Sequence, residues 1–170
     1  MKLYYGGLQA VESPRIIKSE LGRDFGFAFY TTDIREQAER WALRRKRTAL
    51  HNGDLSARAM VFVFQFDEVL AREQLRFRDF PEVSMDWLNL IVACRSNIDY
   101  KHDFDIVTGK IANDNVGETI AYVLAGVMRK EDALERLRFQ KINKQLAFCS
   151  EAALSYLTFD SAYAVEEKKT

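Results

Sequence analysis

The apolar run from residue 59 to residue 66 constrains the fold of this chain more than any other segment. It reads AMVFVFQF, so β-branched and aromatic residues, which favour strands, fill most of its positions. A strand that is apolar on both faces needs protein packed against each face. We therefore expect Ala59 to Phe66 to form a strand that is buried on both sides.

Shorter strands and helices are expected around this run, without the strict strand–helix alternation of a parallel α/β fold. Asp33 and Glu36 have the spacing of a capping box at the start of one helix. The mixture predicts the α+β class with a mainly antiparallel or split sheet. The further strands are predicted at residues 2–5, 27–31, 76–80, 104–112, 145–148 and 156–159. The helices are predicted at residues 15–21, 33–48, 81–95, 114–127 and 131–139, with a short helical turn at 150–154.

At 170 residues the chain is long enough to bury a hydrophobic core without disulfides. We expect one domain over residues 1–165 and a charged tail at 166–170. Lys and Arg total 25 and Asp and Glu also total 25, so no net charge attracts the chain to nucleic acid or to an anionic membrane. The densest basic cluster runs from Arg40 to Arg47 and also contains Arg44, Arg45 and Lys46; on a helix, Arg40, Arg44 and Arg47 would share one face. It is either a solvated helix face or an RNA-binding surface.

The two cysteines, Cys94 and Cys149, both lie in apolar sequence, with no histidine or second cysteine at metal-ligand spacing. We expect buried free thiols and no metal site, as in proteins of the reducing cytoplasm. The chain has no run of about 18 apolar residues, and its first residues lack the pattern of a signal peptide. The sequence therefore predicts a cytoplasmic protein without membrane contact.

Common catalytic signatures are missing, since the chain has no P-loop, no GxSxG and no HExxH motif. The two histidines, His51 and His102, are expected at the surface. His102 is also a candidate acid–base group, because Asp103 and Asp105 follow it closely. These two aspartates flank Phe104, so on a strand their carboxylates would share one face. They either bind a cation or a ligand hydroxyl, or are solvated carboxylates at a strand entrance.

The segment from Thr108 to Asn115 puts small polar residues between a predicted strand and a predicted helix. Backbone N–H groups at such a junction favour anions. One interpretation is therefore a phosphate contact, with Asn113 as a candidate. The other interpretation is ordinary turn and cap chemistry.

Five ordered blocks carry a resemblance to a known family. They are LYYGG at 3–7, DFGFAFYTT at 24–32, QAERWA at 37–42, DFDIVTGKIAND at 103–114 and QLAF at 145–148. Together they span nearly the whole chain and resemble the bacterial domain of unknown function 3990 family. The first two motifs of that family are in turn similar to those of ADP-ribosyltransferases of the diphtheria-toxin and poly(ADP-ribose) polymerase branch. That branch carries a His-Gly strand, a Phe-Gly-x-Gly-x-Tyr strand and a late Glu.

This resemblance implies an ADP-ribosyltransferase-like split antiparallel β-sandwich with surrounding helices, and NAD as a substrate in a cleft between the sheets. Gly6 is implied to hold the nicotinamide amide through its backbone, and Tyr30 to stack on the nicotinamide ring. Tyr5 takes the position of the histidine that contacts the adenosine ribose. Gln145 takes the position of the catalytic glutamate. The NAD-binding residues expected on this basis are Tyr5, Gly6, Gly7, Gly26, Tyr30, Thr31 and Asn113.

Cleavage of the bond between nicotinamide and ribose passes through an oxocarbenium-like state, which a nearby carboxylate stabilises. Gln145 carries an amide instead, which can hold ribose hydroxyls but supplies no charge. Asp103, Asp105 or Glu151 is then a candidate for the missing carboxylate. The expected catalytic residues are therefore Gln145 and Tyr5, from the resemblance, and Asp105, from its proximity in the sequence alone.

The leading interpretation is an NAD-binding protein that transfers ADP-ribose to a protein or nucleic-acid acceptor, with toxin biology and an antitoxin partner implied by the family. The alternative is a catalytically inactive module of the same fold that binds a nucleotide, a nucleic acid or a protein. Tyr5 and Gln145 favour the alternative, whereas Gly6 and Tyr30 favour a ligand site. Tyr30 itself either stacks on the ligand or packs in the core.

Overall fold

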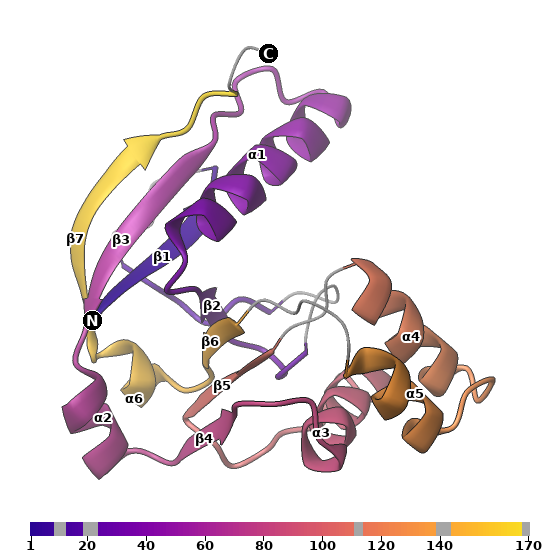
Figure 1. Cartoon of the computed structure of the whole chain (residues 1–170). Helices are drawn as coiled ribbons and strands as arrows, with labels where there is room; N and C mark the ends of the chain where they lie inside the picture. Colours follow the sequence, from indigo (N-terminus) through magenta and orange to yellow (C-terminus); the bar gives the residue numbers. More distant parts are fainter. Residues whose placement is uncertain (9–12, 19–23, 111–113, 139–143, 168–170) are drawn as a thin grey trace.

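Two β-sheets form the centre of the molecule, and helices lie outside them (Figure 1). The computed structural model describes residues 1–8, 13–18, 24–110, 114–138 and 144–167. Within these residues, the first sheet holds, in spatial order, β1 (Lys2–Gly7), β3 (Met60–Phe66) and β7 (Leu157–Ala164). The second holds β2 (Phe29–Thr31), β6 (Lys144–Phe148), β5 (Ile106–Lys110) and β4 (Phe77–Phe80). The helices are α1 (Arg35–His51), α2 (Glu68–Gln74), α3 (Met85–Ser96), α4 (Asp114–Leu124), α5 (Lys130–Leu137) and α6 (Glu151–Leu154). The predicted α+β class is confirmed.

The apolar run at residues 59–66 forms β3, the middle strand of the first sheet, and pairs antiparallel with both β1 and β7. Phe62 and Phe64 face the second sheet and pack with aromatic residues of β2 and β6. Val61, on the opposite face, packs with Ala38 of α1. Each face of β3 therefore meets its own protein layer, and the predicted burial on both faces is confirmed.

The outer face of the second sheet is covered by α3, α4 and α5 (Figure 1). Trp87 of α3 is fully buried there, and its indole N–H donates to the carbonyl of Lys110 at 2.7 Å. Ile120 of α4 and Leu137 of α5 fill the same core against Val107 of β5. Within the described residues, none of the helices is long and apolar enough to cross a membrane.

The two sheets meet along one short contact between Tyr4 of β1 and Thr32, which follows β2. Their backbones exchange N–H···O bonds of 2.8 and 3.0 Å. Past this contact β1 continues beside β3, while β2 continues beside β6. The sheets therefore diverge from a common line, with one hydrophobic core between them and another beneath the second sheet.

One strand pairing departs from the predicted antiparallel arrangement, because β4 and β5 are parallel. The helix α3 lies between them in sequence and supplies the long crossover that parallel neighbours need. The other pairings between named strands of the described chain are antiparallel. The prediction of a mainly antiparallel sheet is thus confirmed, and a wholly antiparallel sandwich is wrong at β4.

The predicted helix at 15–21 is wrong over its described part, since residues 13–18 are not helical. The N–H of Ile17 donates to the carbonyl of Ala28 at 3.2 Å, so this segment pairs with the chain entering β2. The remaining residues of the predicted helix, 19–21, lie outside the described part of the chain.

The predicted capping box at Asp33 and Glu36 is also wrong. The helix α1 begins after Ile34, which makes no side-chain cap, and the hydroxyl of Thr32 accepts the N–H of Ile34 at 3.1 Å instead. The helix α2 was not predicted, although Asp67 caps it. A short helix with few buried positions leaves a weak periodic signal.

Gly6 sets the distance between β1 and α1. A Cβ at residue 6 would overlap the carbonyl oxygen of Ala38 and lie 2.9 Å from the backbone nitrogen of Ala42. Both partners are helix backbone, which cannot rotate away as a side chain can. The absence of a side chain at Gly6 therefore allows α1 to pack directly on the strand.

We expect Gly6→Ala to lower the free energy of unfolding by about 1–3 kcal/mol, because the added methyl group forces α1 away from β1. Gly117→Ala in α4 is the matched control, since no atom lies within 4 Å of its added Cβ. Within a helix this control should raise stability by about 0.5–1 kcal/mol. Urea unfolding followed by tryptophan fluorescence measures both changes. A Gly6→Ala protein as stable as the wild type would contradict this packing.

Candidate functional site

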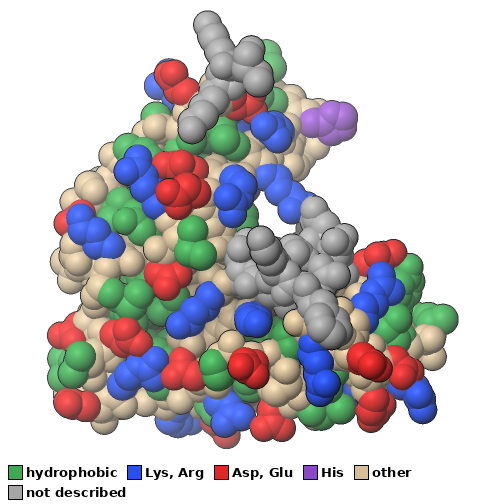
Figure 2. Space-filling view, in the orientation of Figure 1, with side chains coloured by type: hydrophobic (Ala, Val, Ile, Leu, Met, Phe, Trp, Pro, Cys, Tyr) green, Lys and Arg blue, Asp and Glu red, His purple; other side chains and the backbone are tan. Residues whose placement is uncertain are grey.

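Two adjoining cavities open between α1 and the ends of the strands. The larger, which we name the central cavity, has a volume of ≈ 770 Å³. The smaller, which we name the adjoining cavity, has a volume of ≈ 640 Å³. Both are of the size of small-molecule sites, about 300–1,000 Å³. Figure 2 shows a hollow below α1 with Lys and Arg side chains along its rim. The described residues that line both cavities are Tyr5, Leu8, Ile17 and Arg45.

Strand residues from both sheets form one side of the central cavity. Tyr5 and Gly6 come from β1, Tyr30 from β2 and Gln145 from β6. The three strands are distant in the sequence, and the diverging sheets bring these residues to one place. The cavity therefore contains four of the residues that the sequence predicts at the site.

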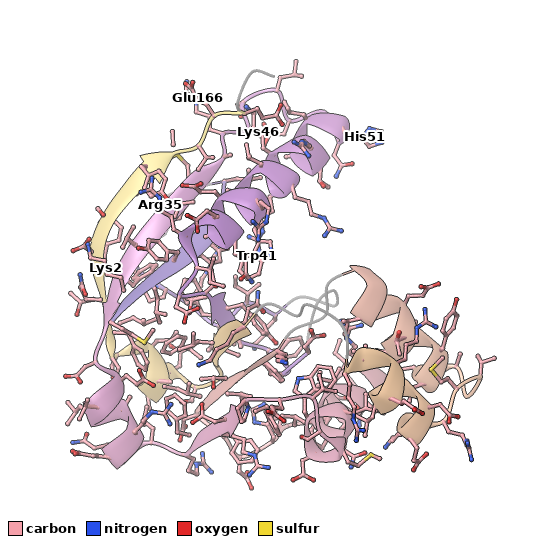
Figure 3. The ribbon with its side chains drawn as sticks, in the orientation of Figure 1. Lys2, Arg35, Trp41, Lys46, His51 and Glu166 are labelled. Carbon is pink, nitrogen blue, oxygen red and sulfur yellow. The ribbon has the colours of Figure 1, made fainter. Side chains whose placement is uncertain are left out.

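The other side of the central cavity is formed by α1, through Trp41, Arg44, Arg45, Thr48 and Ala49. These residues recur three or four positions apart, which places them on one helix face. Figure 3 shows Trp41 pointing from α1 toward the second sheet. This cavity face was not predicted from the sequence, because the charge pattern groups Arg40, Arg44 and Arg47, whereas the cavity face follows the helical spacing from Trp41.

Tyr30 is half-buried and fixed at its hydroxyl end. The hydroxyl accepts the N–H of Phe25 at 3.0 Å and donates to the carbonyl of Gly26 at 2.7 Å. Burial raises the pKa of Tyr30 well above its ordinary value of 10.0 and outweighs the Phe25 hydrogen bond, which lowers it. The phenol therefore stays neutral, and the ring has a fixed position at the cavity wall.

The turn that holds Tyr30 depends on Gly26, whose φ is +81°, a backbone conformation that favours glycine. The carbonyl of Phe25 in this turn accepts from Nε2 of His102 at 2.9 Å. The Nδ1 of His102 accepts the N–H of Phe104 at 3.2 Å, so the ring proton belongs on Nε2. His102 is thus half-buried and positions the turn, and its predicted place at the surface is wrong.

Tyr5 stands between the two cavities and is only 6% exposed. Its ring stacks on Phe29 with centroids 4.8 Å apart, and its hydroxyl accepts from Nη1 of Arg45 at 2.8 Å. The guanidinium carbon of Arg45 also lies 5.3 Å from the centroid of the Tyr5 ring. A cation–π contact and a hydrogen bond therefore hold the same arginine between the cavities.

Gln145 lies on β6 opposite Gly109 of β5 and is 8% exposed. Its place in the lining of the central cavity gives that cavity a buried amide, with both donor and acceptor capacity. No ionisable group is added by this residue. Gln145 can therefore orient ligand hydroxyls but cannot balance a positive charge.

Positive charge predominates in both cavities. The described lining of the central cavity contains Arg44 and Arg45 and no carboxylate. In the described lining of the adjoining cavity, Arg15, Lys18 and Arg45 face one carboxylate, Asp54. Guanidinium groups bind phosphates through paired hydrogen bonds. The combination of aromatic rings and arginines suits an anionic ligand with an aromatic part.

Several predicted site residues lie outside the described lining of both cavities. Gly7 packs beside the Tyr5 ring, and Gly26 acts through the turn that holds Tyr30. The hydroxyl of buried Thr31 donates to the carbonyl of Leu146 at 3.3 Å and ties β2 to β6. Asn113 lies outside the residues that the structure describes.

Asp105 also lies away from the described cavity lining. Its carboxylate accepts from the backbone N–H and the Nε of Arg76 at 3.0 and 3.2 Å. Burial alone would raise the pKa of Asp105, but hydrogen bonds from Arg76 and Ser150 hold it below its ordinary value. Asp103, 4.0 Å from the same guanidinium, has a side chain that is 95% exposed. Because β5 begins at Ile106, the expected shared strand face of the two aspartates is wrong.

Cys94 and Cys149 carry thiols and form no disulfide, as predicted, with Cys94 buried and Cys149 half-buried. Burial raises the pKa of Cys149 to about 12. Since the thiolate is the nucleophilic form, this thiol is unreactive at neutral pH. Neither cysteine lines the described part of the two cavities.

We expect Tyr30→Phe to lower the free energy of unfolding by about 1–2 kcal/mol, because two buried backbone groups lose their partner. The folded protein keeps Tyr30 neutral at a pH where the unfolded chain ionises it. The stability advantage of the wild type over Tyr30→Phe is therefore full below about pH 10 and shrinks above it. Urea unfolding at a series of pH values measures this difference. Tyr100→Phe, at an exposed position, is the control for the loss of one hydroxyl. If the difference in stability between the wild type and Tyr30→Phe did not change with pH, the buried, neutral phenol would be contradicted.

Asp105→Asn tests whether this carboxylate has a structural role. The pKa of Asp105 is lower in the folded protein than in the unfolded chain, where it is about 4. The ionised carboxylate therefore stabilises the fold above about pH 4, and this stabilisation is lost as the pH falls further. We expect the variant to be about 1–3 kcal/mol less stable at neutral pH and to approach the wild type in acid. Chemical unfolding at several pH values measures this trend. Asp103→Asn should change little, and an equal loss in the two variants would mean that the contacts with Arg76 are not specific to Asp105.

Comparison with protein families finds a match to the family described as "Protein of unknown function (DUF3990)" over residues 1–159. No curated protein and no solved structure matches the chain. The matched residues run from before β1 into β7 and include both cavities. Because the match covers most of the sequence, the chain belongs to the DUF3990 family, as its five sequence blocks predicted.

Proposed function

We propose that the central cavity binds NAD and that the protein transfers the ADP-ribose part of NAD to a macromolecular acceptor. One observation carries the proposal: Tyr5, Gly6, Tyr30 and Gln145 line the same cavity although three different strands supply them. These are four of the residues to which the resemblance to ADP-ribosyltransferases gives a role at NAD. Within the family, which has no assigned function, this juxtaposition is the basis for the proposal.

The backbone of Gly6 supports a role in holding an amide. Backbone groups alternate in direction along an antiparallel strand. Since the N–H and C=O of Tyr4 point away from β3 and bond to Thr32, those of Gly6 point the same way. Gly6 lies beyond the contact with Thr32 and lines the central cavity. A carboxamide such as that of nicotinamide could then pair with both groups of this residue.

The side chains of the central cavity supply the remaining contacts that NAD requires. Tyr30 offers a fixed aromatic ring for stacking on a flat heterocycle. Arg44 and Arg45 offer guanidinium groups for the pyrophosphate. Gln145 offers an amide for the ribose hydroxyls. Aromatic, cationic and amide groups thus occur together in a cavity of ≈ 770 Å³.

In the proposed reaction, the bond between C1 of the ribose and the nicotinamide nitrogen breaks, and nicotinamide leaves with the bonding electron pair. A nucleophile of the acceptor bonds to the same carbon and releases its proton to solvent. Positive charge develops on the ribose between these events. Gln145 would orient the ribose, and Tyr30 would hold the departing ring in place.

A nucleotide receptor without catalysis is the second candidate, and the charges of the central cavity favour it. Its described lining has two arginines and no carboxylate. Such a field favours a bound pyrophosphate but opposes a developing cation. The two candidates therefore share one ligand and differ only in the fate of the nicotinamide–ribose bond.

Calorimetric titration with NAD, combined with a measurement of nicotinamide release, separates the two candidates. We expect Arg45→Gln to weaken NAD binding by about tenfold, because it removes a charged hydrogen-bond donor. Arg40→Gln removes the same charge from the same helix outside the described cavity lining, and should bind NAD as the wild type does. Binding with release supports transfer, and binding without release supports a receptor. No binding at about 1 mM NAD would contradict both candidates.

Gln145→Glu provides a sharper test of the catalytic position. If Gln145 lies beside the reacting ribose, the added carboxylate should stabilise the cation and increase nicotinamide release at least about tenfold. Asn52→Asp adds a carboxylate to the same cavity from the end of α1 and is the matched control. If Gln145→Glu binds NAD but releases no more nicotinamide than Asn52→Asp, residue 145 is not at the reacting bond.

A further inference from the structure

The adjoining cavity has cationic side chains that the proposed NAD site does not use. Arg15 and Lys18 line it and are both exposed to solvent. Arg45 lies at its border with the central cavity. In the described residues, no carboxylate forms an ion pair with any of these three side chains.

Most arginines elsewhere in the described chain are paired, although Arg40, Arg58 and Arg138 are not. Many of them have a carboxylate partner, and the closest pairs are short and well directed. The arginines with such a partner are Arg35, Arg47, Arg72, Arg76, Arg78, Arg95, Arg129 and Arg136. Within the described residues Arg15 and Lys18 have no carboxylate partner, so their charges are not neutralised by an ion pair there. Unpaired cations in a concave site attract an anion from solution.

The single carboxylate in the described lining does not neutralise these cations. Asp54 accepts from the backbone N–H and the hydroxyl of Ser56 at 3.1 and 2.7 Å. It thus closes a local turn. The described lining of the adjoining cavity remains positive in total, with Arg58 one residue after the lining residue Ala57.

The position of the adjoining cavity connects it to the proposed reaction. It shares Tyr5 and Arg45 with the central cavity, and Arg45 bonds to the Tyr5 hydroxyl between them. A ligand in the adjoining cavity would lie next to NAD in the central cavity. This is the position that an acceptor must occupy.

We infer that the adjoining cavity binds single-stranded nucleic acid and presents it to the central cavity as the acceptor of ADP-ribose, an inference that rests on the proposed function. The cations would contact successive phosphates, and Arg45 would lie where the strand meets NAD. A nucleophile of the strand then bonds to C1 of the ribose, nicotinamide leaves with the electron pair, and the proton passes to solvent.

A polyanion fits this surface better than a single small anion does. Arg44 and Arg45 suffice for the one pyrophosphate of NAD, so Arg15 and Lys18 are additional. The exposed Arg40 of α1, which also has no carboxylate partner in the described chain, extends the positive surface beyond the cavities. Positive grooves with neighbouring aromatic rings are typical of single-strand binding. The half-buried Trp41 supplies such a ring in the central cavity.

The test uses a fluorescent single-stranded RNA of about 12 nucleotides, a length within the range of known single-strand sites. Its binding to the full chain is followed by anisotropy over a series of salt concentrations. We expect the double variant Arg15→Gln, Lys18→Gln to bind about tenfold more weakly near physiological salt, and the slope of log K against log salt to flatten by about 1.4. NAD affinity, measured by calorimetry on the same protein, should not change.

The double variant Lys101→Gln, Arg138→Gln is the matched control. It removes the same charge from exposed positions that line neither cavity in the described residues. Loss of RNA binding in the cavity variant alone, with NAD affinity intact, supports the inference. Equal losses in both double variants, or no RNA binding by the wild type, would overturn it. Loss of NAD affinity in the cavity variant would also overturn it, because the adjoining cavity would then hold part of NAD or another small phosphate.

The outcomes for the two proposals are distinguishable. Wild-type protein that binds NAD but not RNA leaves the proposed function in place and removes this acceptor. Protein that binds RNA through Arg15 and Lys18 but never binds NAD contradicts the proposed function and overturns the acceptor role. Radiolabelled NAD offered with the RNA, followed by electrophoresis, shows whether label is transferred to the strand. Label on the protein instead would favour a protein acceptor and overturn the inference.

Discussion

The contact between β1 and α1 at Gly6 is the constraint on which both cavities depend. With no Cβ at residue 6, the helix backbone reaches the strand at Ala38 and Ala42. The following turns of α1 then lie beside the open edge of β1, which brings Arg45 to within hydrogen-bond distance of the Tyr5 hydroxyl. Packing alone therefore explains why residue 6 is a glycine. Its backbone contact with a ligand, in the proposed function, uses a geometry that the fold already requires.

Tyr30 connects the central cavity to the hydrophobic core beneath the second sheet. Its ring lines the cavity, while its hydroxyl is bonded inside the turn that Gly26 forms. His102 holds the same turn from another segment by bonding to the carbonyl of Phe25. The interpretations of Tyr30 as a stacking ring and as a core residue are thus compatible, because opposite ends of one side chain serve the two roles. A ring fixed in this way loses little further freedom when a ligand stacks on it.

The sequence predicted the features that local patterns determine, and missed those that depend on distant partners. The run at 59–66 could be placed because burial on both faces leaves a nearly continuous apolar pattern. The parallel pairing of β4 depends on the path of α3, which no local pattern specifies. At the candidate site, the ordered blocks pointed to four residues of the central cavity. The cavity face of α1 was missed, because which helix face meets β1 is decided by the contact at Gly6. The structural role of Asp105 could not be predicted either, because its hydrogen-bond partner Arg76 lies 29 residues away in the sequence.

Binding and bond cleavage make opposite electrostatic demands on the central cavity. In the proposed function Arg44 and Arg45 would stabilise the pyrophosphate of a bound dinucleotide, but their charge would raise the energy of a cation on the ribose. Gln145 does not offset this effect, since an amide has no net charge. A nucleic-acid strand in the adjoining cavity would place phosphates beside Arg45 and reduce the positive field at the ribose. On this view the acceptor itself would supply negative charge where the ADP-ribosyltransferases that the chain resembles use a glutamate. The bond to nicotinamide would then break readily only when the acceptor is present, which would protect NAD from hydrolysis by the unoccupied protein.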